Sequence, residues 1–526
     1  MDTNFEGRVI VVANRLPITI TPKPDGNFDY SMSSGGLVSG LRSLAKVVDF
    51  KWFGWPGIDV HRNDKDTVRR ELQDQFGAVP VFLNSDLAER HYNGFSNSVL
   101  WPLMHRMPDK VFSEKTWAAA YQEVNEVFAD NILPIVEDGD IIWVHDYHLL
   151  LLPGILRQRM TKKKNLRIGF FLHTPFPSED FFSILPFREA ICQSLLSCDV
   201  VGFHTNGYAK DFVESACTVL EGVSVSPNDL HYEGRKVIVH GFPIGIQPQE
   251  FKDRLGAEET QEELERLRND FRGQKVIVGV DRLDYIKGIP QKLKAFDRFL
   301  TENPDWLGKV ALIQLAIPTR ADVSTYQKLR DEVERLIGYI NGKHSTFSHT
   351  PIHYLYRSVK PEHLCALYAV ADVCIISSLQ DGLNMVSYEF SACQAENKTK
   401  GILVMSQYAG AAKTLPACVV VNPWDTPRFA EHIRNTLTMP DHEREDRYRQ
   451  NEKIVDEWTS VKWGISFLNT VIRMQLPKAE ESNSTSADAS LNQDIESKNR
   501  PHLDGDLEHM DDHDARFALP DDWSKG

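Results

Sequence analysis

Residues 275–288 read KVIVGVDRLDYIKG, an uninterrupted apolar run that ends in a cluster of charged side chains. A run rich in β-branched residues and without alternation is typical of a strand buried on both faces of a parallel sheet. Similar runs follow at residues 309–317, 372–377, 401–405 and 418–421. An earlier set, separated by helical patterns such as residues 115–131, lies at residues 8–13, 140–144, 166–172 and 199–203. This order predicts an α/β fold with parallel sheets covered by helices on both faces.

The chain has 526 residues, enough for two to four domains. The two sets of strands predict two Rossmann-like domains, residues 1–245 and 246–476, that join near the Gly- and Pro-rich residues 239–247. We expect the last helix of the second domain to pack back on the first. Residues 477–526 hold 13 acidic and 5 basic residues without helical or strand period, which predicts a disordered acidic tail. A partner-docking role for this tail is the alternative.

Composition excludes several classes of protein. The net charge of −15 disfavours a nucleic-acid binder, which usually carries an excess of basic residues. Seven scattered cysteines without a C-x-x-C pair are typical of reduced thiols in a cytosolic protein. The acidic N-terminus resembles no secretory signal, and no apolar stretch approaches the ~20 residues that span a bilayer. We therefore expect a cytoplasmic protein that binds neither nucleic acid nor membrane.

Ligands of open α/β sheets bind at the carboxyl ends of the strands, so the residues that follow each strand are the candidates. After residues 140–144 comes His145-Asp146-Tyr147-His148, in which Asp146 suits sugar hydroxyls better than a metal ion. His173 follows residues 166–172, as a ligand donor or as a structural histidine. The adjacent glycines Gly35 and Gly36 open a helical pattern and could let backbone N–H groups reach an anion, although an ordinary turn fits them as well.

Two later strand ends carry more specific patterns. Arg282 and Lys287 fit a diphosphate clamp; the alternative is two surface cations, and Asp281 and Asp284 could neutralise them. Residues 380–389 read QDGLNMVSYE. A helix starting near residue 384 would place its free N–H groups, Asp381 and Glu389 where they could hold a nucleotide sugar. The aromatic residues of segment 51–102 fit either a core or the stacking of sugar rings: Trp55, Tyr92 and Trp101.

Seven segments together resemble a known family, the UDP-forming trehalose-6-phosphate synthases. They are VANRLP, SSGGLVSG, YNGFSNSVLWPLMH, VHDYHLL, GFFLHTPFPS, DRLDYIKG and DGLNMVSYE, in order between about residues 8 and 476. The resemblance implies the GT-B architecture, in which two Rossmann-like domains face each other across a cleft. It implies a retaining glucosyltransferase that makes α,α-trehalose 6-phosphate and UDP from UDP-glucose and glucose 6-phosphate, the first step of trehalose biosynthesis. It implies no cofactor and no tightly bound metal.

The resemblance also implies roles for individual residues. Those implied for glucose 6-phosphate are Arg15, Tyr92, Trp101, Asp146 and Arg320. Those implied for UDP-glucose are Gly36, His173, Arg282, Lys287, Val359, Asp381, Gly382, Leu383, Asn384, Met385, Val386 and Glu389. The catalytic residues implied among them are His173, Arg282, Lys287 and Asp381.

The resemblance further implies a homo-oligomer, a role in the stress response, and a possible complex with a trehalose-6-phosphate phosphatase or regulatory subunits. Because the acidic tail replaces the phosphatase domain of larger relatives, we expect trehalose 6-phosphate as the released product. Two other functions stay open. One is a transferase or phosphorylase of the same architecture with a different acceptor, such as a glycogen-synthase-like enzyme; the other is a non-catalytic sensor of glucose 6-phosphate.

Overall fold

The computed structural model describes residues 7–474, except 25, 34, 164, 186, 227–228, 321–322 and 398–399. These described residues form one compact unit. The predicted acidic tail, residues 477–526, lies outside the described residues. The predicted domain boundaries at residues 245 and 476 stay predictions.

The first sheet has nine strands in the order β5-β4-β1-β6-β7-β8-β11-β10-β9. All neighbours from β5 to β11 are parallel, and β11, β10 and β9 continue as antiparallel neighbours. The bounds, in sheet order, are Ala78–Pro80, Phe50–Trp55, Val9–Arg15, Ile141–His145, Arg167–Phe171, Val200–Phe203, Arg235–Gly241, Asp229–Tyr232 and Ser224–Ser226. The four runs predicted in this half are therefore β1, β6, β7 and β8.

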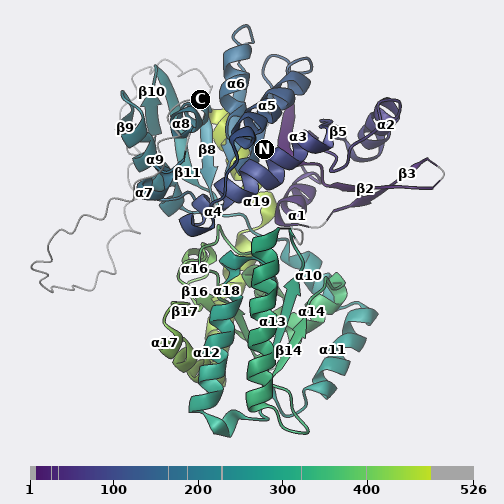
Figure 1. The fold of residues 1–526 in the computed structure, drawn as a ribbon, viewed down its shortest axis with the longest axis vertical. Helices are drawn as coiled ribbons and strands as arrows, with labels where there is room; N and C mark the ends of the chain where they lie inside the picture. Colours follow the sequence, from purple (N-terminus) through teal and green to yellow (C-terminus); the bar gives the residue numbers. More distant parts are fainter. Residues whose placement is uncertain are drawn as a thin grey trace, which may run out of the picture. The chain divides into compact units, whose positions relative to one another are not determined.

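Helices cover both faces of this sheet. One face carries α5 (Lys115–Ile132), α6 (Leu152–Arg159), α8 (Arg188–Leu196) and α9 (Asn206–Val219). The other carries α1 (Gly36–Leu44), α2 (Lys65–Phe76) and α19 (Ser460–Arg473), the yellow-green helix of Figure 1. Phe467 of α19 stacks on Trp143 with ring centroids 4.7 Å apart. The last described helix therefore packs on the sheet whose strands lie between residues 9 and 241.

The second sheet has six parallel strands in the order β14-β13-β12-β15-β16-β17. Their bounds are Ile352–Leu355, Val310–Ile317, Lys275–Arg282, Val373–Ile376, Ile402–Ser406 and Val419–Val421. One face packs on α12 (Ile289–Glu302), α13 (Ser324–His344) and α17 (Thr426–Leu437). The other packs on α11 (Glu258–Asp270), α14 (Pro361–Val370) and α15 (Val386–Cys393). The predicted α/β fold with helices on both faces of parallel sheets is confirmed (Figure 1).

The remaining elements are short or connect the sheets. They are β2 (Ile18–Pro22), β3 (Phe28–Met32), α3 (Ser85–Glu89), η1 (Arg90–Leu100), α4 (Trp101–Met104), η2 (Pro108–Lys110), η3 (Tyr147–Leu149), α7 (Glu179–Phe182), α10 (Pro248–Leu255), η4 (Tyr285–Lys287), η5 (Pro304–Trp306), η6 (Gln394–Glu396), α16 (Ala411–Thr414) and α18 (Asp441–Glu457). Of these, η1 is a π-helix of 11 residues, a form that is rare and frequent at functional sites. It carries Tyr92.

Candidate functional site

A cavity of about 560 Å³ lies at the carboxyl ends of strands from both sheets. From the first sheet it receives the residues that follow β6 and β7, and from the second those that follow β12, β13 and β15. Fifteen of the predicted site residues line it: Gly36, Tyr92, Trp101, Asp146, His173, Arg282, Lys287, Arg320, Asp381, Gly382, Leu383, Asn384, Met385, Val386 and Glu389. The structure thus brings together residues from six of the seven segments.

Two predicted residues do not line this cavity. Arg15 ends β1 with its guanidinium carbon 5.2 Å from the ring centroid of Trp55. Val359 lines a second cavity of about 430 Å³, together with Arg357, His363 and Leu367. The binding roles of Arg15 and Val359 stay predictions.

The shortest ion pair among the residues that line the cavity joins Lys287 to Asp381. Lys287 Nζ donates to Asp381 Oδ2 at 2.6 Å, and the same oxygen accepts from Ser378 at 2.9 Å and from Asn384 at 3.1 Å. Burial alone would raise the pKa of Asp381, but the charge and hydrogen bond of Lys287 lower it to about 2. Asp381 is therefore a fixed carboxylate, suited to accept hydrogen bonds from sugar hydroxyls rather than to carry a proton.

The loop after Asp381 leads directly into α15, as the sequence predicted. The helix begins at Val386, and Met385 occupies its N-terminal cap. Gly382 lies so close to the first sheet that a Cβ atom there would stand 2.2 Å from the carbonyl oxygen of His173. Glu389, in the first turn of α15, accepts a hydrogen bond from Tyr368 at 3.0 Å. The glycine lets the helix N-terminus and its two acidic residues reach the cavity.

Three histidines of the first sheet form a buried row behind this loop. His145 Nδ1 and His173 Nε2 lie 3.1 Å apart, and the rings of His173 and His204 meet edge to face at 5.3 Å. Burial lowers the pKa of His145 and of His204 to about 3, and it also lowers that of His173. All three are neutral near pH 7, so His173 can donate a hydrogen bond to a ligand but does not add positive charge.

Asp146 follows β6 with a φ of 73°, in the left-handed region that is uncommon for residues other than glycine. Its Oδ1 accepts the backbone N–H of His173 at 3.2 Å. Burial raises its pKa to about 6, against the backbone hydrogen bonds from Tyr147 and His173 that lower it. Its Oδ2 lies 3.9 Å from Nδ1 of His148, too far for a hydrogen bond, so a ligand hydroxyl that donates to Oδ2 would stabilise the carboxylate.

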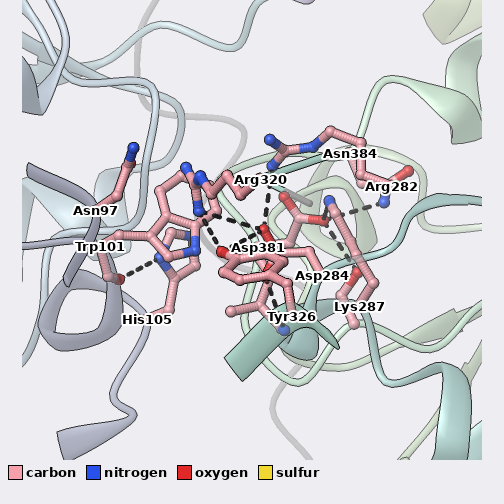
Figure 2. A network of polar contacts seen from close by, with 12 residues as sticks. Asn97, Trp101, His105, Arg282, Asp284, Lys287, Arg320, Tyr326, Asp381 and Asn384 are labelled. Atoms are coloured by element: carbon pink, nitrogen blue, oxygen red, sulfur yellow. Dashed lines mark hydrogen bonds and ion pairs between the residues drawn. The ribbon is translucent and has the colours of Figure 1, made fainter. Parts of the chain in front are cut away.

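Arg282 and Arg320 both stack on Trp101, which also lines the cavity (Figure 2). The guanidinium carbon of Arg320 lies 4.5 Å, and that of Arg282 5.3 Å, from a ring centroid of Trp101. Both are within the range of cation–π attraction. Arg320 has a φ of 46°, and its side chain is 6% exposed. Two cations so close together form a wall suited to more than one phosphate group.

The comparisons with known proteins agree with this arrangement. Residues 7–473 match the model of glycosyltransferase family 20. This chain belongs to glycosyltransferase family 20. It is 48% identical over 476 residues to the α,α-trehalose-phosphate synthase (UDP-forming) of Candida albicans, covering 90% of this chain and 99% of that one. It is 47% identical over 490 residues to the 56 kDa subunit of the Saccharomyces cerevisiae enzyme of that name, covering 92% and 97%.

Solved structures extend the likeness to the fold. One, described as "Trehalose-6-phosphate from E. coli bound with UDP-2-fluoro glucose", matches with a TM-score of 0.79 and 31% identity. The match covers 90% of this chain and all of that one. This member of glycosyltransferase family 20 has the GT-B architecture, with two Rossmann-like sheets whose strand ends line a common cavity.

Two tyrosines at or beside this cavity, Tyr147 and Tyr326, were not among the predicted site residues. Tyr147 donates to Asn97 at 2.8 Å and accepts from Arg320 at 3.4 Å, and Tyr326 of α13 contacts Arg320 and Asp284. Tyr147 was inside a quoted segment, but nothing in the spacing of Tyr326 pointed to the site. Within the described residues, no group of three or more His, Cys, Asp or Glu is placed to hold a metal ion.

Proposed function

We infer that this protein is a retaining glucosyltransferase that makes α,α-trehalose 6-phosphate and UDP from UDP-glucose and glucose 6-phosphate. One observation carries this function beyond family membership. Arg282, implied for the donor diphosphate, and Arg320, implied for the acceptor phosphate, stack on the same Trp101. A transfer between two phosphorylated substrates needs two anion sites at one reaction centre, and an unphosphorylated acceptor would leave Arg320 without a ligand.

The individual roles are part of the proposal. Arg282, Lys287 and the N-terminal amides of α15 bind the diphosphate and stabilise the charge that develops on the leaving UDP. His173 and the residues from Asp381 to Asn384 hold the glucosyl group. The backbone N–H groups of Gly36, Met385 and Val386 bind the donor phosphates, and Glu389 binds the ribose. Asp146, Tyr92 and Trp101 contact the acceptor sugar, and Arg15 adds a second contact to its phosphate. Val359 contacts the uracil.

The transfer step follows from these positions. The C1 hydroxyl oxygen of the acceptor attacks the anomeric carbon of the donor from the face that UDP leaves. The bond between that carbon and the β-phosphate oxygen breaks, and this oxygen takes the proton of the attacking hydroxyl. The low pKa of Asp381 supports this route, because a carboxylate with a pKa of about 2 is a poor proton acceptor. Holding both substrates in the cavity supplies much of the rate.

We further propose that the reaction requires no tightly bound metal, because the chain's own cations can neutralise the leaving group. An assay before and after exhaustive chelation tests this directly.

The described residues contain no helix long and apolar enough to cross a membrane. We also propose that the protein is cytoplasmic and acts in the stress response. It would work as a homo-oligomer or in a complex with phosphatase and regulatory subunits. The subunit name of the yeast relative supports a complex.

The product tests the proposed function. Purified protein incubated with UDP-glucose and glucose 6-phosphate is expected to give a non-reducing phosphorylated disaccharide. Proton NMR should show two α-anomeric signals, because the donor configuration is retained. Incorporation of glucose from UDP-glucose into glucan, or phosphorolysis of a disaccharide, would favour the alternative transferase or phosphorylase. Binding of both substrates without turnover would favour the sensor.

A further inference from the structure

Asp284 is a buried carboxylate that faces two arginines at once. Its side chain is fully buried, and its Oδ2 lies 3.8 Å from Arg282 Nη2 and 3.6 Å from Arg320 Nη1. Oδ1 accepts the backbone N–H of Ile286 at 3.3 Å, which fixes the orientation of the carboxylate. Figure 2 shows Asp284 between these side chains. Arg282 ends β12, and Arg320 lies in the loop after the neighbouring strand β13.

The two arginines that face Asp284 differ in their exposure to solvent. The side chain of Arg282 is 40% exposed, whereas that of Arg320 is 6% exposed. Because like charges repel strongly where water is excluded, two guanidinium groups on one indole ring need a nearby anion. Asp284 supplies this negative charge to both arginines, and its Oδ2 is the atom that lies near both guanidinium groups.

Tyr326 extends the network toward one arginine only. Its hydroxyl group donates to Asp284 Oδ2 at 3.3 Å and accepts a hydrogen bond from Arg320 Nη1. The hydroxyl of Tyr147, from the first sheet, accepts from Arg320 Nη2 at 3.4 Å. The guanidinium group of Arg320 is thus held by Tyr147 of η3 and Tyr326 of α13, and Tyr326 adds a second link to Asp284 beside the direct ion pair.

We propose that Asp284 is a positioning residue for both phosphate-binding arginines and that Tyr326 is a positioning residue for Arg320 alone. The inference rests on the proposed function, because it takes Arg282 as the donor arginine and Arg320 as the acceptor arginine. It assigns an asymmetry: loss of the Tyr326 hydroxyl weakens acceptor binding, whereas loss of the Asp284 charge weakens the binding of both substrates.

Initial rates on the full chain test this asymmetry, with each substrate varied at a saturating level of the other. Tyr326→Phe is expected to raise the KM for glucose 6-phosphate about tenfold and to leave the KM for UDP-glucose within about twofold. Asp284→Asn is expected to raise both constants about tenfold or more. A purely structural role would lower the melting temperature without producing this split.

The chain offers matched controls away from the cavity. Asp199 also bridges two arginines, Arg157 at 2.8 Å and Arg235 at 3.0 Å, and Tyr448 donates to Glu452. Asp199→Asn and Tyr448→Phe should leave both constants unchanged in protein that remains folded.

The wild-type chain is assayed first. A rate of UDP release that does not depend on glucose 6-phosphate would contradict both the proposed function and this inference. With that dependence established, the inference alone is overturned if Tyr326→Phe raises both constants equally or neither. It is also overturned if Asp284→Asn raises only one. If Asp284→Asn does not fold, the split expected for Tyr326→Phe decides the matter.

Discussion

At the residue scale, the charge state of Asp146 gives a prediction on stability. Its pKa of about 6 in the folded protein lies above the ordinary value of 3.8, so ionisation is disfavoured by folding. Stability therefore falls as pH rises from about 4 to about 6 and stays low above that range. Asp146→Asn should remove this penalty and raise the free energy of unfolding at pH 7.5 by about 1–2 kcal/mol. Asparagine also tolerates the left-handed backbone of this position.

Denaturant unfolding of Asp146→Asn and wild type at pH 7.5 and pH 4 measures this effect. The difference should be largest at pH 7.5 and should vanish near pH 4, while the KM for glucose 6-phosphate rises at both pH values. If Asp146→Asn is less stable than wild type at pH 7.5, the ionised Asp146 does not destabilise the folded protein and the prediction is wrong.

The ion pair of Lys287 and Asp381 has the opposite effect on stability from Asp146, because ionised Asp381 stabilises the folded protein. Asp381 has a lowered pKa, so its contribution to stability is present above about pH 4 and is lost as pH falls toward 2. Lys287→Met leaves a buried carboxylate without its cation and should cost about 3–5 kcal/mol of stability. Adding Asp381→Asn to that variant should restore part of the loss. Thermal unfolding of the two single variants and the double variant gives the coupling, and additive losses would contradict the pairing.

Much of the residue-level site could be predicted because its members sit in segments directly after buried strands. Asp381, Lys287 and Asp146 are examples, and the sequence also flagged Asp284 as a group that could neutralise Arg282. It could not reveal Tyr326, which reaches the site only because α13 follows β13 and places its first turn over Arg320. Nor could it show that Arg15 lies over Trp55 rather than on the cavity wall.

At the scale of elements, the approach of the α15 loop to β7 depends on Gly382. A Cβ atom 2.2 Å from the carbonyl oxygen of His173 forces the loop to shift. Gly382→Ala should therefore cost about 1–3 kcal/mol of stability and raise the KM for UDP-glucose more than that for glucose 6-phosphate. Gly342→Ala in α13, where nothing lies within 4 Å, should instead be neutral or stabilising by up to about 1 kcal/mol. Equal effects at the two glycines would contradict the close approach.

The sequence predicted nine of the parallel strands. It did not predict the parallel strands β4, β5, β11 and β14 or the more exposed antiparallel strands. Runs such as residues 275–280 and 309–317 are mostly apolar because helices cover both faces of these strands. The β2–β3 hairpin and the antiparallel strands β9 and β10 are short and largely exposed, so packing leaves little apolar signature in them. The π-helix η1 was read only as an aromatic segment, because its extra residue per turn has no simple sequence period.

At the scale of the whole molecule, the proposed donor contacts come mainly from residues of the second sheet and its loops, and the proposed acceptor contacts mainly from those of the first. Binding both substrates should therefore draw the two sheets together. Small-angle X-ray scattering of the chain with UDP and glucose 6-phosphate is expected to give a smaller radius of gyration than that of the free protein. UDP alone or glucose 6-phosphate alone should give a smaller decrease in the radius of gyration than both together. An unchanged radius with both ligands bound would contradict closure.

The central claim is transfer of glucose from UDP-glucose to a phosphorylated sugar. The most direct test is UDP release by the purified chain alone, with and without glucose 6-phosphate and with unphosphorylated glucose in its place. We expect release that depends on glucose 6-phosphate, with glucose a poor substitute because Arg320 then has no phosphate to bind. Equal release with glucose, or release with no acceptor at all, would contradict the account of the two arginines on Trp101.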